Sequence, residues 1–133
     1  MAHKSYIDIL KQYKAEDLPE FSEIELVEVD QRGNFGNTPL HVACVRGSIT
    51  EVKLLFEAGA NIDAAGELGN TPLHEAIGQS HLNVVSYLIE LGARTDIPND
   101  FGDTAKRLAI QKDLNIEPMI SERTKKSKFG RPN

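Results

Sequence analysis

The sequence predicts an all-α repeat solenoid, a stack of small helix–turn–helix units that share no single closed core. Thr-Pro-Leu-His occurs twice, at residues 38–41 and 71–74, a step of 33 residues (38 to 71). Other residues recur at the same step: Gly36, Gly69 and Gly102; Ala43, Ala76 and Ala109; Asp30, Asp63 and Asp96. We therefore expect function on a surface assembled across units rather than in one pocket.

The first full unit, residues 33–65, opens with a turn rich in glycine and asparagine. Thr38 is expected to cap a helix that starts at Pro39, where the missing N–H costs no hydrogen bond. Gly47 is expected to end that helix, and Gly59 to stop a second helix over residues 49–58.

The second unit, residues 66–98, repeats this scheme, with its second helix over residues 82–91. The third unit, residues 99–124, keeps only the opening, and its Lys106 and Arg107 suit a terminal face that meets water. A shorter helix is expected after Asn115. Residues 125–133 are predicted to form a basic, disordered tail.

Residues 1–32 are predicted to form a degenerate N-terminal capping unit. Apolar residues lie close to helical spacing over residues 7–13, and a second apolar stripe runs between acids over residues 18–26. The expected order is a cap, two full repeats and a truncated C-terminal repeat. That meets the minimum of about three units needed to bury the faces of a stack.

Composition bounds the class of protein. The chain has 133 residues, 40% of them hydrophobic, with a formal net charge of −5 and one cysteine. No apolar run approaches the ~20 residues of a membrane span, and the lysines spread through the N-terminus do not fit a signal peptide. We expect a soluble, cytoplasmic chain that is a monomer on its own, without a membrane or nucleic-acid partner.

Charge is concentrated at two places. Residues 16–30 hold seven acids and no base, and residues 123–131 hold five bases and no acid. The acidic run either steers a basic protein or forms the solvated face of a cap helix, and we favour the solvated face. The basic run either solvates the tail or binds nucleic acid or anionic lipid, and we favour solvation, because five positive charges alone are weak evidence for a binding site.

The residue types that carry chemistry do not form a catalytic pattern. His41 and His74 lack other metal ligands at ligand spacing. His41 and Cys44 could pair a base with a thiol, but a small residue between packed helices explains Cys44 better. We expect no enzyme activity, no metal and no cofactor.

The Gly-x-Thr-Pro-Leu-His openings and the closing pairs Gly59-Ala60 and Gly92-Ala93 resemble the ankyrin repeat over about residues 27–112. The resemblance implies that each Thr–His pair ties a helix start together, and that the recurring aspartates bond loop N–H groups between units. It also implies contact with a protein partner through the turns and the exposed ends of the first helices. The corresponding positions are Arg32, Asn34, Phe35, Asn37, Val45, Arg46, Glu67, Leu68, Asn70, Gln79, Asp100, Phe101, Asp103, Gln111 and Lys112.

Three of these positions, Phe35, Leu68 and Phe101, recur at the 33-residue step and are apolar. They either anchor a partner or pack on the adjacent hairpin, and we favour the anchors. The sequence thus predicts a non-catalytic protein-binding module that occludes its partner, as an inhibitor or an immunity- or antitoxin-like neutraliser does. The alternatives are a scaffold or adaptor, and an anionic-ligand module that uses the basic tail.

Overall fold

The computed structural model describes residues 4–130, with side chains up to residue 124. Its α-helices are α1 (Tyr6–Ala15), α2 (Pro39–Arg46), α3 (Ile49–Glu57), α4 (Pro72–Gly78), α5 (Leu82–Glu90), α6 (Ala105–Gln111) and α7 (Glu117–Gly130). Two short 3-10 turns, η1 (Pro19–Phe21) and η2 (Glu67–Gly69), lie between them. The described residues contain no strand, so the predicted all-α class is confirmed.

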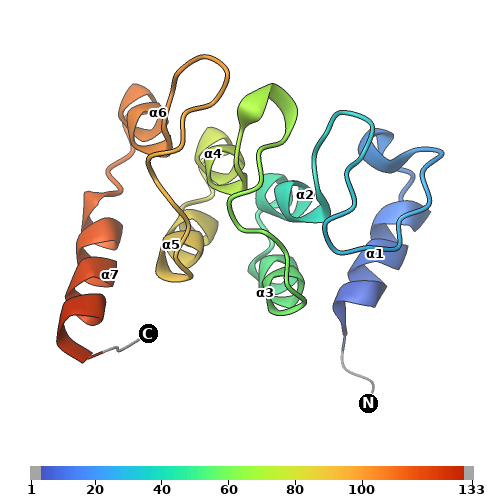
Figure 1. The fold of residues 1–133 in the computed structure, drawn as a ribbon, viewed down its shortest axis with the longest axis horizontal. Coiled ribbons are helices and arrows are strands. Elements are labelled where there is room, and N and C mark those ends of the chain that lie inside the picture. The colour runs from blue at the N-terminus through green and yellow to red at the C-terminus, as the bar shows by residue number, and fades with distance from the viewer. Residues whose placement is uncertain (1–3, 131–133) are drawn as a thin grey trace.

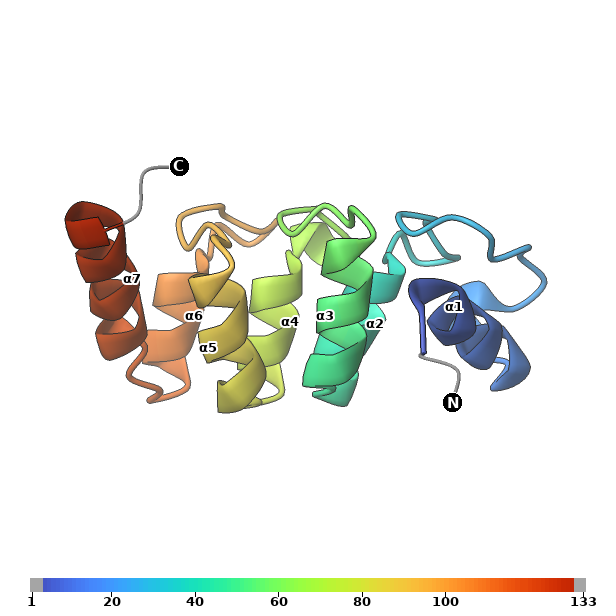
Figure 2. The ribbon, with the colours of Figure 1, turned by 90° about the horizontal axis from the view of Figure 1, so that it is seen from below.

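The helices form two layers that run the length of the stack (Figure 1). The inner helices α2, α4 and α6 pack side by side, and the outer helices α1, α3, α5 and α7 pack in a second row. Three loops project from one edge and form a third row, which Figure 2 shows from below. The core is therefore a continuous seam between the layers.

The inner helices begin as the sequence predicts. Thr38 and Thr71 are the N-cap residues of α2 and α4, and a proline follows each of them. Gly47 closes α2 with φ 76°, a left-handed conformation that favours glycine. A Cβ atom at Gly47 would also lie 2.8 Å from the ring of His81, so the next unit leaves no room for a larger residue.

The N-terminal cap differs from the prediction. Residues 18–26 do not form a second helix: α1 ends at Ala15, Asp17 has φ 51°, and only the turn η1 follows. Pro19 disfavours helical geometry at Leu18, which explains the break. The interpretation of the acidic run as one face of a cap helix is therefore wrong, and its Glu20 is buried.

Beyond α6 the prediction also needs correction. The expected short helix is α7, which at 14 residues is longer than α3 or α5 with 9 each. Buried Ile116 anchors its start, and Arg123 donates hydrogen bonds to the carbonyls of Ile89 (3.1 Å) and Ala93 (2.8 Å). Disorder from residue 125 was expected, but the helix continues to Gly130, because no proline or glycine interrupts it once it has formed. Residues 131–133 lie outside the described part.

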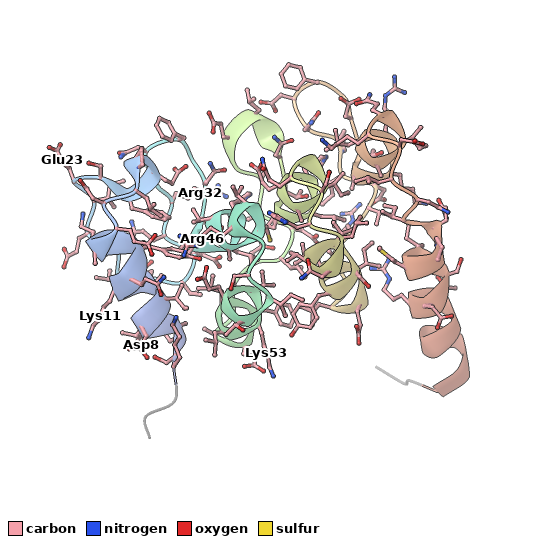
Figure 3. All side chains as sticks on the ribbon, turned by 180° about the vertical axis from the view of Figure 1, so that it is seen from behind. Asp8, Lys11, Glu23, Arg32, Arg46 and Lys53 are labelled. Carbon is pink, nitrogen blue, oxygen red and sulfur yellow. The ribbon has the colours of Figure 1, made fainter. Side chains whose placement is uncertain are left out.

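A buried polar network joins the cap to the first repeat. Glu51, 5% exposed, stands where the next unit has the core residue Val84. Its carboxylate accepts a hydrogen bond from the hydroxyl of buried Tyr13 and pairs with Arg46, the last residue of α2, which is labelled in Figure 3. Burial raises the pKa of Tyr13, so the hydroxyl remains a donor. Arg46 also bonds Glu16 at 2.7 Å, which ties the end of α1 to α2.

We expect stability to fall with acidification, because burial lowers the pKa of both His41 and His74 below the usual 6.5. Below that value the unfolded chain binds more protons than the folded one. The free energy of unfolding should then decrease as the pH falls below about 6.5, by at most ~1.4 kcal/mol per pH unit for each histidine. Guanidinium titrations across this range measure it, and an unchanged midpoint with both imidazoles titrating near pH 6.5 would contradict it.

Candidate protein-binding groove

The hairpins at residues 33–37, 66–70 and 99–103 are fixed to each other by the two buried histidines. The backbone N–H of Thr38 donates to Nδ1 of His41, so the proton of the neutral ring sits on Nε2 and is donated to the carbonyl of Asn70 (2.9 Å). His74 repeats this arrangement with Thr71 and the carbonyl of Asp103 (2.8 Å). The inner helices α2 and α4 thus each hold the hairpin of the following unit.

In the structure the predicted contact residues fall into two groups, at opposite ends of the inner helices. Arg32 directly precedes the first hairpin, and the other members of the first group lie on the hairpins: Asn34, Phe35, Asn37, Glu67, Leu68, Asn70, Asp100, Phe101 and Asp103. The others lie at the C-terminal ends of the inner helices: Val45 and Arg46 on α2, Gln79 after α4, and Gln111 and Lys112 at the end of α6. Partner contact at these positions stays a prediction.

Several polar members of this set serve the fold. Arg32 donates to the carbonyls of Gly36 and Ala65, which joins the first two hairpins. Asn34 donates to the carbonyls of Pro19 and Ser22 in the cap. Their side-chain donors are therefore already engaged within the protein.

Glu20 organises the first hairpin from outside it. Its carboxylate accepts the N–H of Phe35 (2.8 Å), the N–H of Asn37 (3.2 Å) and the Asn37 side chain (2.7 Å). Asn99 does the same locally in the third hairpin, where its side-chain oxygen accepts the N–H groups of Phe101 and Asp103. The cap thus supplies a group that the first hairpin lacks.

The apolar tip residues are among the exposed members of this set. Phe35 and Leu68 are each 51% exposed and Phe101 is 70% exposed. Packing against a neighbouring hairpin therefore accounts for only part of their surface. These three residues are called the tip row below.

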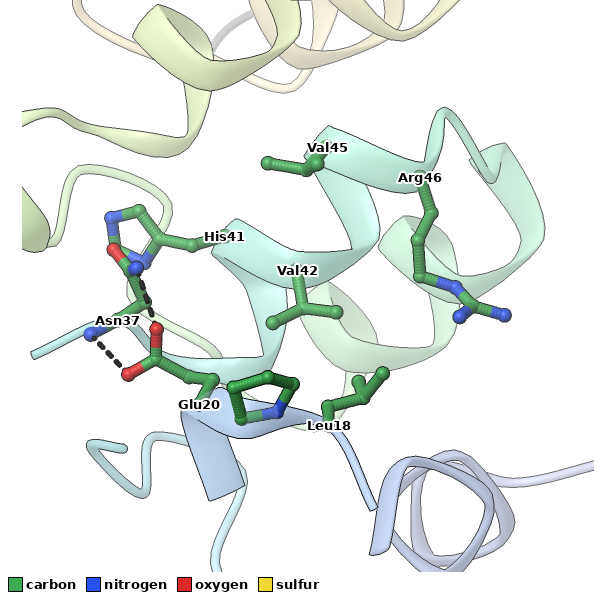
Figure 4. A pocket seen from close by; sticks show the side chains of 8 residues that line it. Leu18, Glu20, Asn37, His41, Val42, Val45 and Arg46 are labelled. Carbon is green, nitrogen blue, oxygen red and sulfur yellow. Dashed lines mark hydrogen bonds between the residues drawn. The ribbon is translucent and has the colours of Figure 1, made fainter. Parts of the chain in front are cut away.

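A hollow of about 280 Å³ lies between the cap and α2 (Figure 4). It exists because the turn η1, rather than another inner helix, covers this side of α2. Apolar and polar side chains both line it: Leu18, Pro19, Val42 and Val45, with Glu20, Asn37, His41 and Arg46. The hollow has the mixed lining that suits one apolar side chain of a partner.

A family model for ankyrin repeats, in three copies, matches residues 2–99. The chain belongs to the ankyrin repeat family. Ankyrin repeats are generally protein–protein interaction modules, and the matched region includes both the first two hairpins and the hollow. Among curated proteins, none matches this chain. No helix within the described residues is long and apolar enough to cross a membrane.

Three features of this ankyrin groove were not predicted from the sequence. The hollow at Val42 was not foreseen, because a missing inner helix leaves no mark at the repeat step. Glu75, the equivalent of Val42 in the next unit (42 to 75), was not singled out, although comparison at the step shows a carboxylate there in place of a valine. The exposure of Ile110, which is 77%, was not predicted either, because its equivalents Cys44 and Ile77 are buried between inner helices.

Proposed function

We propose that this ankyrin repeat chain is a non-catalytic module that binds a protein partner through its groove and tip row. The observation that carries the proposal is the exposure of Phe35, Leu68 and Phe101 at equivalent positions of successive hairpins. Large apolar side chains of this kind supply most of the binding energy in protein interfaces.

The backbone at Leu68 supports a role beyond folding. Leu68 has φ 57° and ψ 23°, a left-handed conformation that costs an ordinary side chain roughly 1 kcal/mol or more. Glycine or asparagine would adopt it more easily, and half of the leucine side chain gains no burial in return. Folding alone therefore does not account for leucine at this tip, whereas contact with a partner does.

The finer proposal is that binding occludes the partner, as an inhibitor or an immunity- or antitoxin-like protein would in the cytoplasm. The hollow adjoins the first hairpin of the tip row, because Asn37 of that hairpin lines it, so a bound partner would be covered over a continuous surface. If the captured partner is an enzyme, its activity should fall as the chain is added. Unchanged activity in the saturated complex would favour a scaffold or adaptor.

We expect serine at Phe35, Leu68 and Phe101 together to weaken partner binding at least ~30-fold, equivalent to ~2 kcal/mol. Thermal unfolding should change little, because all three side chains are half exposed or more. The measurement is recovery of the partner from the native host by the full chain, followed by titration of the purified pair.

The matched control replaces Ile7, Val27 and Leu82 by serine. These residues are 48%, 59% and 43% exposed and lie on α1, in the cap and on α5 rather than on the hairpins or the inner helices. The control should keep its affinity. If the tip-row variant keeps its affinity and loses several degrees of melting temperature, these residues hold the hairpins together and the proposal fails.

A further inference from the structure

Three arginines along the groove are already engaged by the protein itself, whereas Lys112 at the end of α6 is exposed. Arg46 pairs with Glu16 and Glu51, and Arg107 pairs with Asp103 at 2.9 Å. Arg32 is hydrogen-bonded to two backbone carbonyls. A partner that approaches this edge therefore finds few free positive charges.

Glu75 is the opposite case. It projects from the inner helix α4, is partly buried, and has no cationic side chain within ion-pairing distance among the described residues. Burial raises the pKa of Glu75, and the carboxylates of Glu67 and Glu20 raise it further. A negative charge held in these surroundings destabilises the fold, so folding does not account for it.

The hollow and Glu75 lie one repeat unit apart along the row of inner helices. Val42 lines the hollow, and Glu75 is its equivalent on the adjacent inner helix. Packed helices lie about 8–10 Å apart, and an extended chain rises about 3.3 Å per residue. A partner strand laid across α2 and α4 would span this separation in two or three residues.

We propose that the groove binds an extended segment of a protein that places an apolar side chain in the hollow and an arginine or lysine on Glu75. The choice of a basic residue rests on charge complementarity, because the partner's cation would form with Glu75 an ion pair that the described residues do not provide. The acidic run that precedes the hollow attracts the same kind of partner over longer range. This inference rests on the proposed function and names the chemistry of the partner.

Random 12-residue peptides displayed on phage, selected against the full chain, test the proposal. Enriched peptides should carry arginine or lysine two or three residues from a large apolar residue. Synthetic versions should bind at least ~10-fold more weakly to Glu75→Gln and to Val45→Ser than to the original chain. The matched controls, Glu57→Gln on outer helix α3 and Val27→Ser in the cap, change exposed residues away from the groove and should leave affinity unchanged.

Glu75→Gln should also unfold at the same temperature as the original chain or above it, which separates loss of binding from loss of fold. The inference is overturned if no peptide is enriched, if the enriched peptides lack a basic residue, or if Glu75→Gln binds them equally well. Peptides that depend on the tip row but not on Glu75 would leave the proposed function standing and remove this inference alone. The proposed function itself is tested by the tip-row variant in the host pull-down, and that outcome does not depend on the peptide selection.

Discussion

Replacing Leu88 by alanine is expected to lower the free energy of unfolding by about 2–5 kcal/mol. Leu88 has no exposed surface and lies on α5, which packs against α4 within its unit and against α3 and α7 beside it. The lost side chain would leave a cavity where several helices meet. Leu55, equally buried on α3, should show a loss in the same range.

Chemical denaturation of each variant measures the change, with Leu82→Ala as the control. Leu82 lies on the same helix but is 43% exposed, so its truncation should cost well under 1 kcal/mol. A loss below about 0.5 kcal/mol for both Leu55→Ala and Leu88→Ala would show that the outer helices do not carry the core.

Glu20→Ala is expected to cost about 2–4 kcal/mol, because three hydrogen-bond donors of the first hairpin lose their common acceptor. Glu20 is 7% exposed, so water does not readily take its place. The hairpin that carries Phe35 would loosen with it. Urea titration gives the stability, and amide hydrogen exchange at Phe35 and Asn37 locates the change.

Glu23→Ala is the natural comparison, since Glu23 belongs to the same acidic run and is exposed. It should change stability by less than about 0.5 kcal/mol. Equal effects at the two positions would mean that the acidic run acts through its net charge rather than through the specific bonds of Glu20.

The sequence was sufficient for the repeats and insufficient for the cap. Helices α2 to α5 follow from residues whose effect is local, such as the caps Thr38 and Thr71 and the stop at Gly47. The cap was misjudged because the apolar spacing over residues 18–26 imitates a helix. In the structure the left-handed backbone at Asp17 and the proline at position 19 break the helix in spite of that apolar spacing.

The candidate site was only partly predictable for a related reason. The tip row could be found because it recurs at the repeat step. The polar positions could not be divided into those that serve the fold and those that are free to contact a partner. Bonds such as that between Asn34 and the carbonyl of Pro19 join residues that are not neighbours in the chain, so the sequence does not show them. Likewise, from the sequence alone Glu51 would be taken for a surface residue. Only the structure shows that it accepts a hydrogen bond from Tyr13, which comes 38 residues earlier in the chain.

The bonds from His41 and His74 to the carbonyls of the next hairpin have a consequence for kinetics. Hairpins locked before encounter have little conformational entropy left to lose, so a partner would meet a preorganised surface. Association should then proceed at a rate set by diffusion and charge. Differences between good and poor partners would appear in how long each complex survives.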